Sequence, residues 1–271
     1  MRTFSADYLT TTREGMWDDS REALSDLDLP GRSRILDVGC GTGELTRVVA
    51  EEMDCSGAAD PAVVGLDADH RLLTHARAHC APVQGDACRL PLADGCVDLV
   101  VCQALLVNLQ DPVAAVKEFA RVSSDLVAAI EPDNSEVSVE STVPAEGTLS
   151  ARARRAYLEG VSTDVTLGGE GTQAVFENAG LADVQTRLYH HERIIEPPYD
   201  ATDFADVRRK ATGAGLQSDR ETMLAGGLDE MGYADLRQDW REMGREAATQ
   251  MGTDEYCRRE VVPFYVTVGR V

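Results

Sequence analysis

The chain has 271 residues, of which 43% are hydrophobic, enough for the core of one large domain or of one domain with an insertion. It carries 47 acidic residues against 26 lysines and arginines, so its formal net charge is −21, and only Lys117 and Lys210 among the basic residues are lysines. Such an acid excess normally argues against a nucleic-acid partner. Molar salt, however, confines charge repulsion to about 3 Å. Acidity with scarce lysine therefore indicates a halophilic, haloarchaeal protein, in which an acidic surface is background.

Hydropathy and cysteine spacing argue against a membrane-spanning, a secreted or a metal-binding protein. No apolar run approaches the roughly 20 residues that span a bilayer. The N-terminus lacks the charged-then-apolar profile of a signal peptide, so we expect a cytoplasmic protein. The seven cysteines contain no C-x-x-C pair and are typical of a reducing compartment. His75 and His79 are four residues apart with no third ligand beside them, and no metal site is predicted.

A glycine-rich turn follows the first predicted strand, Arg34–Val38. Gly39, Gly41 and Gly43 are spaced two apart and lead into a helical pattern. Glycine lets the backbone turn sharply and lie flat against a ligand, and a strand-to-helix turn places that ligand at the carboxyl edge of a parallel sheet. The spacing differs from the G-x-G-x-x-G of dinucleotide sites, and Asp37 before the glycines suits a ligand with an amino group. The pattern indicates S-adenosylmethionine.

Polar residues follow the next strands in chain order. They are Asp67 after the strand Val63–Leu66, Asp86 in the turn after a short third strand, and Gln103 after the strand Val97–Cys102. Because parallel strands end at the same edge of a sheet, these side chains are expected near the glycine turn.

Over roughly residues 30–135, these motifs resemble those of class I, Rossmann-like S-adenosylmethionine-dependent methyltransferases. The resemblance implies an α/β fold with a doubly wound, mostly parallel seven-stranded sheet and helical insertions. It also implies S-adenosylmethionine as cofactor, with Asp67 accepting from the ribose hydroxyls and Asp86 from the adenine amine. The cofactor-site residues expected on this basis are Asp37, Gly39, Cys40, Gly41, Gly43, Asp67, Ala68, Asp86, Ala87, Gln103 and, for the methionine carboxylate, Arg13.

The domain organisation departs from the minimal pattern of these enzymes. Residues 1–30 are predicted to be an N-terminal helical segment, and residues 31–271 the methyltransferase domain. Helical insertions are expected at about 134–165 and 197–260, the second in place of a tight hairpin. Asp200 is expected to cap one of these helices. The insertions would form a lid over the acceptor pocket or extra scaffold, and the sequence leaves both open.

The methyl acceptor is less well defined. The N-P-P-Y signature of amide and adenine N-methyltransferases is absent. The segment Cys102–Asn108 occupies its place and resembles that of the methyltransferases that act on small molecules. Val107 and Asn108 occupy the positions where that branch often has histidines, so no catalytic residue is predicted. The nearest candidates for a general base are Glu131, His190 and His191.

Three functions remain open. We expect a methyltransferase for a small molecule, such as a quinone. An alternative is a methyltransferase of RNA or a translation factor, working with a small zinc-binding activator subunit on the sheet edge near Ala81–Gln84. Arginine clusters at residues 152–155 and at Arg208–Lys210 would then contact phosphate, or else only balance neighbouring acids, so direct nucleic-acid binding stays undecided. The third function is that of a non-catalytic cofactor-binding protein.

Overall fold

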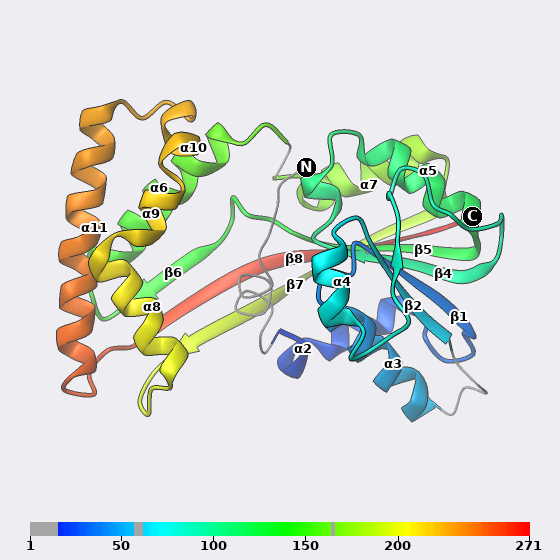
Figure 1. Ribbon diagram of the computed structural model, residues 1–271, viewed down its shortest axis with the longest axis horizontal. Helices are drawn as coiled ribbons and strands as arrows, with labels where there is room; N and C mark the ends of the chain where they lie inside the picture. The colour runs from blue at the N-terminus through cyan, green and yellow to red at the C-terminus, as the bar shows by residue number, and fades with distance from the viewer. Residues whose placement is uncertain (1–15, 57–61, 164–165) are drawn as a thin grey trace. The chain divides into compact units, whose positions relative to one another are not determined.

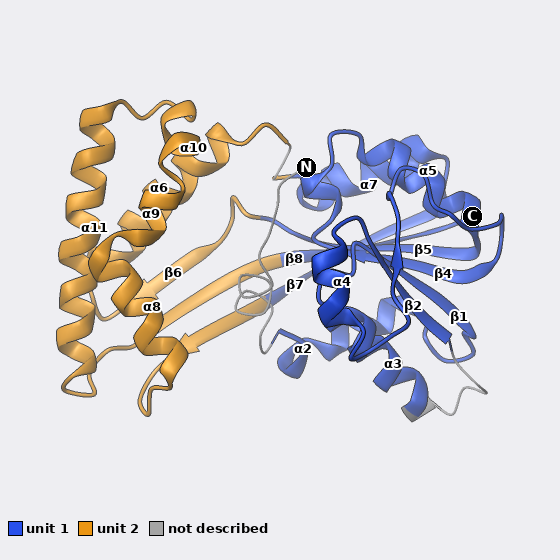
Figure 2. Cartoon of the chain, in the orientation of Figure 1, with its two compact units in different colours: residues 1–133, 167–190, 264–271 blue, residues 134–166, 191–263 orange. Residues whose placement is uncertain are grey.

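A computed structural model describes residues 16–56, 62–163 and 166–271 of the chain (Figure 1). The chain divides into two compact units (Figure 2). Unit 1 comprises residues 1–133, 167–190 and 264–271, and unit 2 comprises residues 134–166 and 191–263. Residues 16–30, expected in a separate N-terminal segment, fall within unit 1.

Unit 1 is built on a mostly parallel sheet in the order β3-β2-β1-β4-β5-β8, and β7 also pairs with β8 (Figure 1). Its strands are β1 (Arg34–Val38), β2 (Ala62–Asp67), β3 (Val83–Gln84), β4 (Val97–Gln103), β5 (Ser123–Pro132), β7 (Ala182–Ile195) and β8 (Arg258–Arg270). Strands β1 to β5 run parallel to one another, and β8 runs antiparallel to β5. The prediction of a Rossmann-like, mostly parallel α/β sheet is confirmed. With β6 (Ser138–Ser141), which also pairs with β8, the sheet has eight strands among the described residues.

Helices cover both faces of this sheet. The helical elements of unit 1 are α2 (Met16–Asp19), η1 (Arg21–Leu27), α3 (Glu44–Ser56), α4 (His70–Ala76), η2 (Leu106–Asn108), α5 (Pro112–Val122) and α7 (Gly168–Ala179). Successive strand residues point to opposite faces. Val100 therefore packs with Phe119 and Phe176 of α5 and α7, whereas Leu99 packs with Trp17 and Met53 on the other face.

Unit 2 contains the helices that the insertions were expected to form. Its elements are β6 (Ser138–Ser141), α6 (Glu146–Gly160), α8 (Ala201–Thr212), α9 (Ala214–Ser218), α10 (Arg220–Ala225) and α11 (Glu230–Met251), together with parts of β7 and β8. Asp200 caps α8 in a capping box with Asp203, as predicted. The helices α8 and α11 cross closely at Gly244, where an added Cβ would lie 2.3 Å from the Ala211 nitrogen.

A buried carboxylate ties the elements of unit 2 together. Glu146, which is 0% exposed, accepts hydrogen bonds from Lys210 Nζ at 2.8 Å and Arg258 Nε at 3.1 Å. It also accepts from Ser141 Oγ at 2.7 Å and from the Tyr256 hydroxyl at 2.9 Å. Burial alone would raise the pKa of Glu146, but the two cations and the serine hold this pKa below its ordinary value. The hypothesis that Lys210 contacts phosphate is therefore wrong, because its ammonium is buried in an internal ion pair.

No helix within the described ranges is both long enough and apolar enough to cross a membrane.

Candidate functional site

The carboxyl ends of four parallel strands meet at one edge of the unit 1 sheet. The register pairs Val38 with Leu66 and with Cys102, and Asp67 with Gln84. The residues that follow these positions therefore lie in one row along the edge, as the sequence predicted.

The glycine loop, Gly39–Gly43, turns the chain from β1 into α3. Gly39, Gly41 and Gly43 have φ values of +74°, +57° and +88°, a region that side chains with a Cβ rarely adopt. The backbone nitrogen of Gly39 donates to the Leu66 carbonyl at 2.7 Å, which fixes the loop to the end of β2. An added Cβ at Gly43 would lie 3.2 Å from Ala76 Cα of α4. The loop thus presents bare backbone at the edge of the sheet.

Asp37 is a buried support of this loop. Its side chain is 1% exposed, and its Oδ2 accepts a hydrogen bond of 2.6 Å from Thr46 Oγ1 in α3. The carboxylate therefore joins the end of β1 to the helix after the loop. Cys40 is also buried, consistent with the small side chain expected there.

Asp67 joins the glycine loop to the start of α4. Its Oδ2 accepts from the Gly41 nitrogen at 2.9 Å, and its Oδ1 accepts from the Asp69 nitrogen at 2.8 Å. Asp69 in turn caps α4 through the Arg71 nitrogen, and the Arg71 guanidinium lowers the pKa of Asp69 to about 2. The half-buried Asp67 carboxylate has acceptor capacity beyond these two bonds, because each oxygen carries two lone pairs. It fits a ligand that donates two adjacent hydroxyls.

The turn after β3 closes the same edge. Asp86 is exposed, and its Oδ1 accepts from the Cys88 nitrogen at 2.9 Å, while Ala87 is buried beside it. Ala68 is exposed, and its carbonyl accepts from Gln84 Nε2 at 3.1 Å. Asp86 and Ala68 are thus open to a ligand at this edge.

Gln103 ends β4 on the other side of the loop. Its side chain is buried, and its Nε2 lies 3.1 Å from Met16 Sδ of α2. The N-terminal segment therefore reaches the end of β4 at Met16. Arg13 lies outside the described residues.

The three candidates for a general base have different positions. Glu131 is fully buried, and its two oxygens accept hydrogen bonds from the backbone nitrogens of Leu105, Leu106 and Val107. These bonds make Glu131 a structural acceptor. On β7, His190 is exposed and His191 is buried.

Metal binding finds no support in the parts of the chain that the structure describes. No group of three or more histidines, cysteines, aspartates or glutamates there is suited to hold a metal ion. His75 lies in the last turn of α4, whereas His79 lies beyond the end of that helix.

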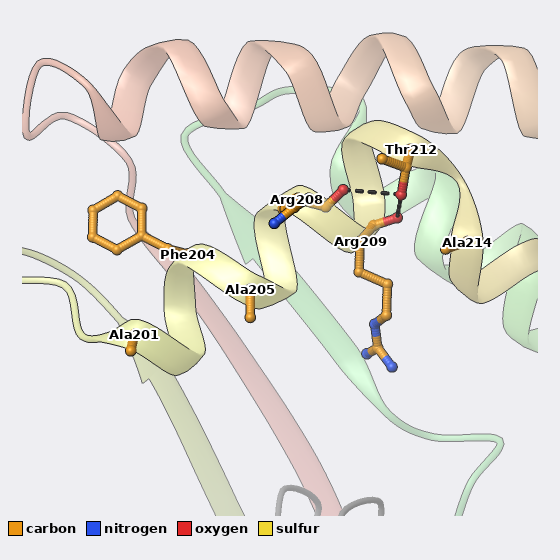
Figure 3. A pocket seen from close by; sticks show the side chains of 7 residues that line it. All are labelled: Ala201, Phe204, Ala205, Arg208, Arg209, Thr212 and Ala214. Atoms are coloured by element: carbon orange, nitrogen blue, oxygen red, sulfur yellow. Dashed lines mark hydrogen bonds between the residues drawn. The ribbon is translucent and has the colours of Figure 1, made fainter.

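A shallow groove lies on the exposed face of α8 in unit 2 (Figure 3). Phe204 and Arg208 line it, and Arg209 also contributes while pairing with Asp206. The groove holds no cluster of titratable groups suited to catalysis. Of the two predicted clusters, Arg155, Arg208 and Arg209 are exposed, whereas Arg152 and Arg154 are half-buried.

Comparisons with known proteins agree with this architecture. A family profile described as a methyltransferase domain matches residues 36–125. The chain is 27% identical over 188 residues to a demethylmenaquinone methyltransferase of Staphylococcus aureus strain JH9, covering 62% of this chain and 76% of that protein. A candidate methyltransferase from Bacillus halodurans C-125 has a similar structure, with a TM-score of 0.54 and 15% identity over 93% of this chain and 98% of that one.

A further solved structure is a complex between the Trm112 methyltransferase activator of Haloferax volcanii and a candidate methyltransferase. It matches with a TM-score of 0.50 and 18% identity over 96% of this chain and 92% of that one.

The fold is that of a Rossmann-like α/β protein, with the β1–α3 turn at the carboxyl edge of its parallel strands. Residues 36–125 are a methyltransferase domain.

Proposed function

We propose that the chain is an S-adenosylmethionine-dependent methyltransferase that acts on a small, largely apolar acceptor of the quinol type. The similarity to a demethylmenaquinone methyltransferase over 62% of the chain carries the proposal. The segment Ala104–Asn108, which we call the post-β4 segment, supports it. Leu106 and Val107 are buried there, and the N-P-P-Y signature is absent.

The proposal assigns the cofactor to the edge formed by the glycine loop, Asp67 and the turn at Asp86. Bare glycine backbone accommodates the methionine part, and Asp67 supplies acceptors for the ribose hydroxyls. The full set proposed is Asp37, Gly39, Cys40, Gly41, Gly43, Asp67, Ala68, Asp86, Ala87 and Gln103, with Arg13 as a further prediction.

Methyl transfer requires little acid–base catalysis from the residues of the chain. When bound, S-adenosylmethionine supplies a methyl group that its sulfonium has already activated, so positioning and exclusion of water dominate. A deprotonated quinol hydroxyl makes the adjacent ring carbon nucleophilic. That carbon would take the methyl group with release of S-adenosylhomocysteine, and its proton would pass to water. Glu131 is not assigned as the base, because its oxygens already accept backbone hydrogen bonds.

We also propose that unit 2, which contains most of both insertions, selects the acceptor as a lid. Shortening residues 200–255 should then abolish turnover, while S-adenosylhomocysteine still binds.

The function is tested with the purified chain, labelled S-adenosylmethionine and a prenylated 1,4-naphthoquinol kept reduced. We expect label in the quinol product, identified by mass spectrometry. Binding of S-adenosylhomocysteine without label transfer to this quinol or to a metabolite extract would contradict the small-molecule proposal. Failure to bind the cofactor product at any salt concentration would contradict the proposed cofactor site itself.

A second candidate function uses an activator subunit. The short strand β3 lies at the edge of the sheet, where an added strand could pair with it. A fold neighbour is named in a complex with the Trm112 activator. If the second function holds, the purified chain should bind cofactor weakly, and co-expression with a small zinc-binding activator should restore binding. Full activity of the isolated chain would contradict this function.

A further inference from the structure

We propose that Glu131 is a positioning residue for the cofactor site, acting through Leu105 on the first glycine of the loop. The inference rests on the proposed function only in taking the glycine loop as part of the cofactor site. Glu131 lies at the end of β5, next to β4 in the sheet (Figure 1). It thus reaches the post-β4 segment from the neighbouring strand.

The hydrogen bonds of Glu131 define the path of that segment. Its Oε1 accepts from the nitrogens of Leu105 at 3.0 Å and Leu106 at 2.9 Å, and its Oε2 accepts from the nitrogen of Val107 at 3.3 Å. The side chain is 0% exposed, so water cannot readily replace these bonds. Three consecutive backbone donors directed at one carboxylate hold the start of η2 in one place.

The residue before these donors also needs such support. Ala104 has a φ of +48°, in the left-handed region that residues with a Cβ seldom adopt. Its nitrogen donates to the Ile130 carbonyl at 2.8 Å, and its carbonyl accepts from Asn108 Nδ2 at 2.8 Å. A strained backbone persists only where its surroundings hold it. The residue pair Ile130–Glu131 supplies that hold from β5.

The Leu105 side chain connects this fixed segment to the glycine loop. A Cβ added at Gly39 would lie 2.9 Å from Leu105 Cδ1 and 3.2 Å from its Cδ2, so the leucine side chain packs directly on the bare Cα of Gly39. Fixing the Leu105 backbone therefore fixes the wall against which Gly39 turns. Glu131 thereby influences the loop without belonging to it.

The test combines Glu131→Gln with Leu105→Ala and measures the Kd for S-adenosylhomocysteine by calorimetry. Glutamine keeps one acceptor oxygen but places an NH₂ donor near at least one backbone donor. We expect Glu131→Gln to raise the Kd about 10-fold, as loss of one buried hydrogen bond would. Amide exchange at Leu105–Val107 should also become faster.

Double-mutant analysis separates positioning from general destabilisation. If Glu131 acts through Leu105, Glu131→Gln should add little once Leu105→Ala is present, because the two changes interrupt the same contact. Independent, fully additive effects would overturn the proposal. So would an unchanged Kd in a folded Glu131→Gln protein. Should that variant not fold, an unchanged Kd for Leu105→Ala alone overturns the proposal.

Asp98→Asn is the matched control. Asp98 Oδ2 accepts from the nitrogens of Ser33 and Arg34 at the amino end of β1, opposite the site. Removing this carboxylate weakens a comparable set of bonds within unit 1. The Kd for S-adenosylhomocysteine should stay at the wild-type value, and an equal rise in Asp98→Asn would overturn the proposal. If the wild-type chain does not bind S-adenosylhomocysteine, the proposed function fails instead.

Discussion

Glu131 in unit 1 and Glu146 in unit 2 are both fully buried, yet their carboxylates have different donors. Glu131 accepts from three consecutive backbone nitrogens, so it fixes the path of a short segment. Glu146 accepts from Lys210 and Arg258 together with two hydroxyls, so it joins separate elements through charge. The first arrangement defines local backbone geometry near the proposed cofactor site. The second stabilises the core of an inserted unit, and it makes that core sensitive to the charge of each partner.

The largest expected effect is a loss of structure at low salt. It comes from the many acidic residues of the chain and not from either buried glutamate. The net charge is −21, and charge repulsion extends to about 30 Å at 0.01 M salt but only about 3 Å at 1 M. We propose that the chain is halophilic and expect it to lose structure when KCl is reduced to tens of millimolar. Circular dichroism during stepwise dialysis measures this loss. An unchanged spectrum would contradict the halophilic interpretation.

Glu146→Gln tests the charged side of the comparison. It removes the negative charge that balances Lys210 and Arg258 while their cations stay buried. Breaking one side of such a network costs about 3–5 kcal/mol. We expect a loss of this size in the free energy of unfolding, measured by urea denaturation at high salt. Glu242→Gln, at an exposed position of α11, is the control and should change the free energy little. A loss below about 1 kcal/mol for Glu146→Gln, within the range of exposed pairs, would show that the cations find other partners.

Asp67→Ala tests a carboxylate that accepts backbone hydrogen bonds and is proposed to accept hydrogen bonds from the ligand as well. The substitution removes the acceptor of the Gly41 nitrogen and the proposed acceptor of the ribose hydroxyls. We expect S-adenosylhomocysteine binding to weaken by about 1–3 kcal/mol, measured by calorimetry. Asp94→Ala, whose carboxylate is exposed and pairs with Arg121, should leave binding intact. Wild-type affinity in Asp67→Ala would remove Asp67 from the ribose role.

The smallest expected effect is the pH dependence of stability that comes from the titration of Glu146, which lies well below neutral pH. Its pKa is held below the ordinary value in the folded chain, where burial opposes but Lys210, Ser141 and Arg258 prevail. Stability from this shift is complete above the unfolded pKa of about 4.3 and is lost as pH falls through the lower folded pKa. We expect the difference in unfolding free energy between wild type and Glu146→Gln to be constant above pH 5 and to shrink below about pH 4. A difference independent of pH would contradict the lowered pKa.

Local backbone chemistry was readable from the sequence. Glycines spaced two apart after an apolar strand predicted the loop, whose three glycines all have positive φ. Asp200 was recognised as a helix cap, and its side chain accepts backbone hydrogen bonds in the first turn of α8. These features depend on residues only a few positions apart, so their types and spacing determine them.

The functions of the buried polar residues were decided only by the tertiary structure. Glu131 bonds to donors 24 to 26 residues away, and Glu146 bonds to Lys210 across 64 residues. Cys40 and Cys80 both pack against Gly65, although nothing in their spacing indicates it. The sequence shows which side chains can titrate or bind a ligand, but packing between distant segments decides which partners they have. The sequence therefore determined the strand ends and the glycine loop, whereas the fold decided that Glu131 holds the Leu105–Val107 backbone and that Lys210 is buried in unit 2.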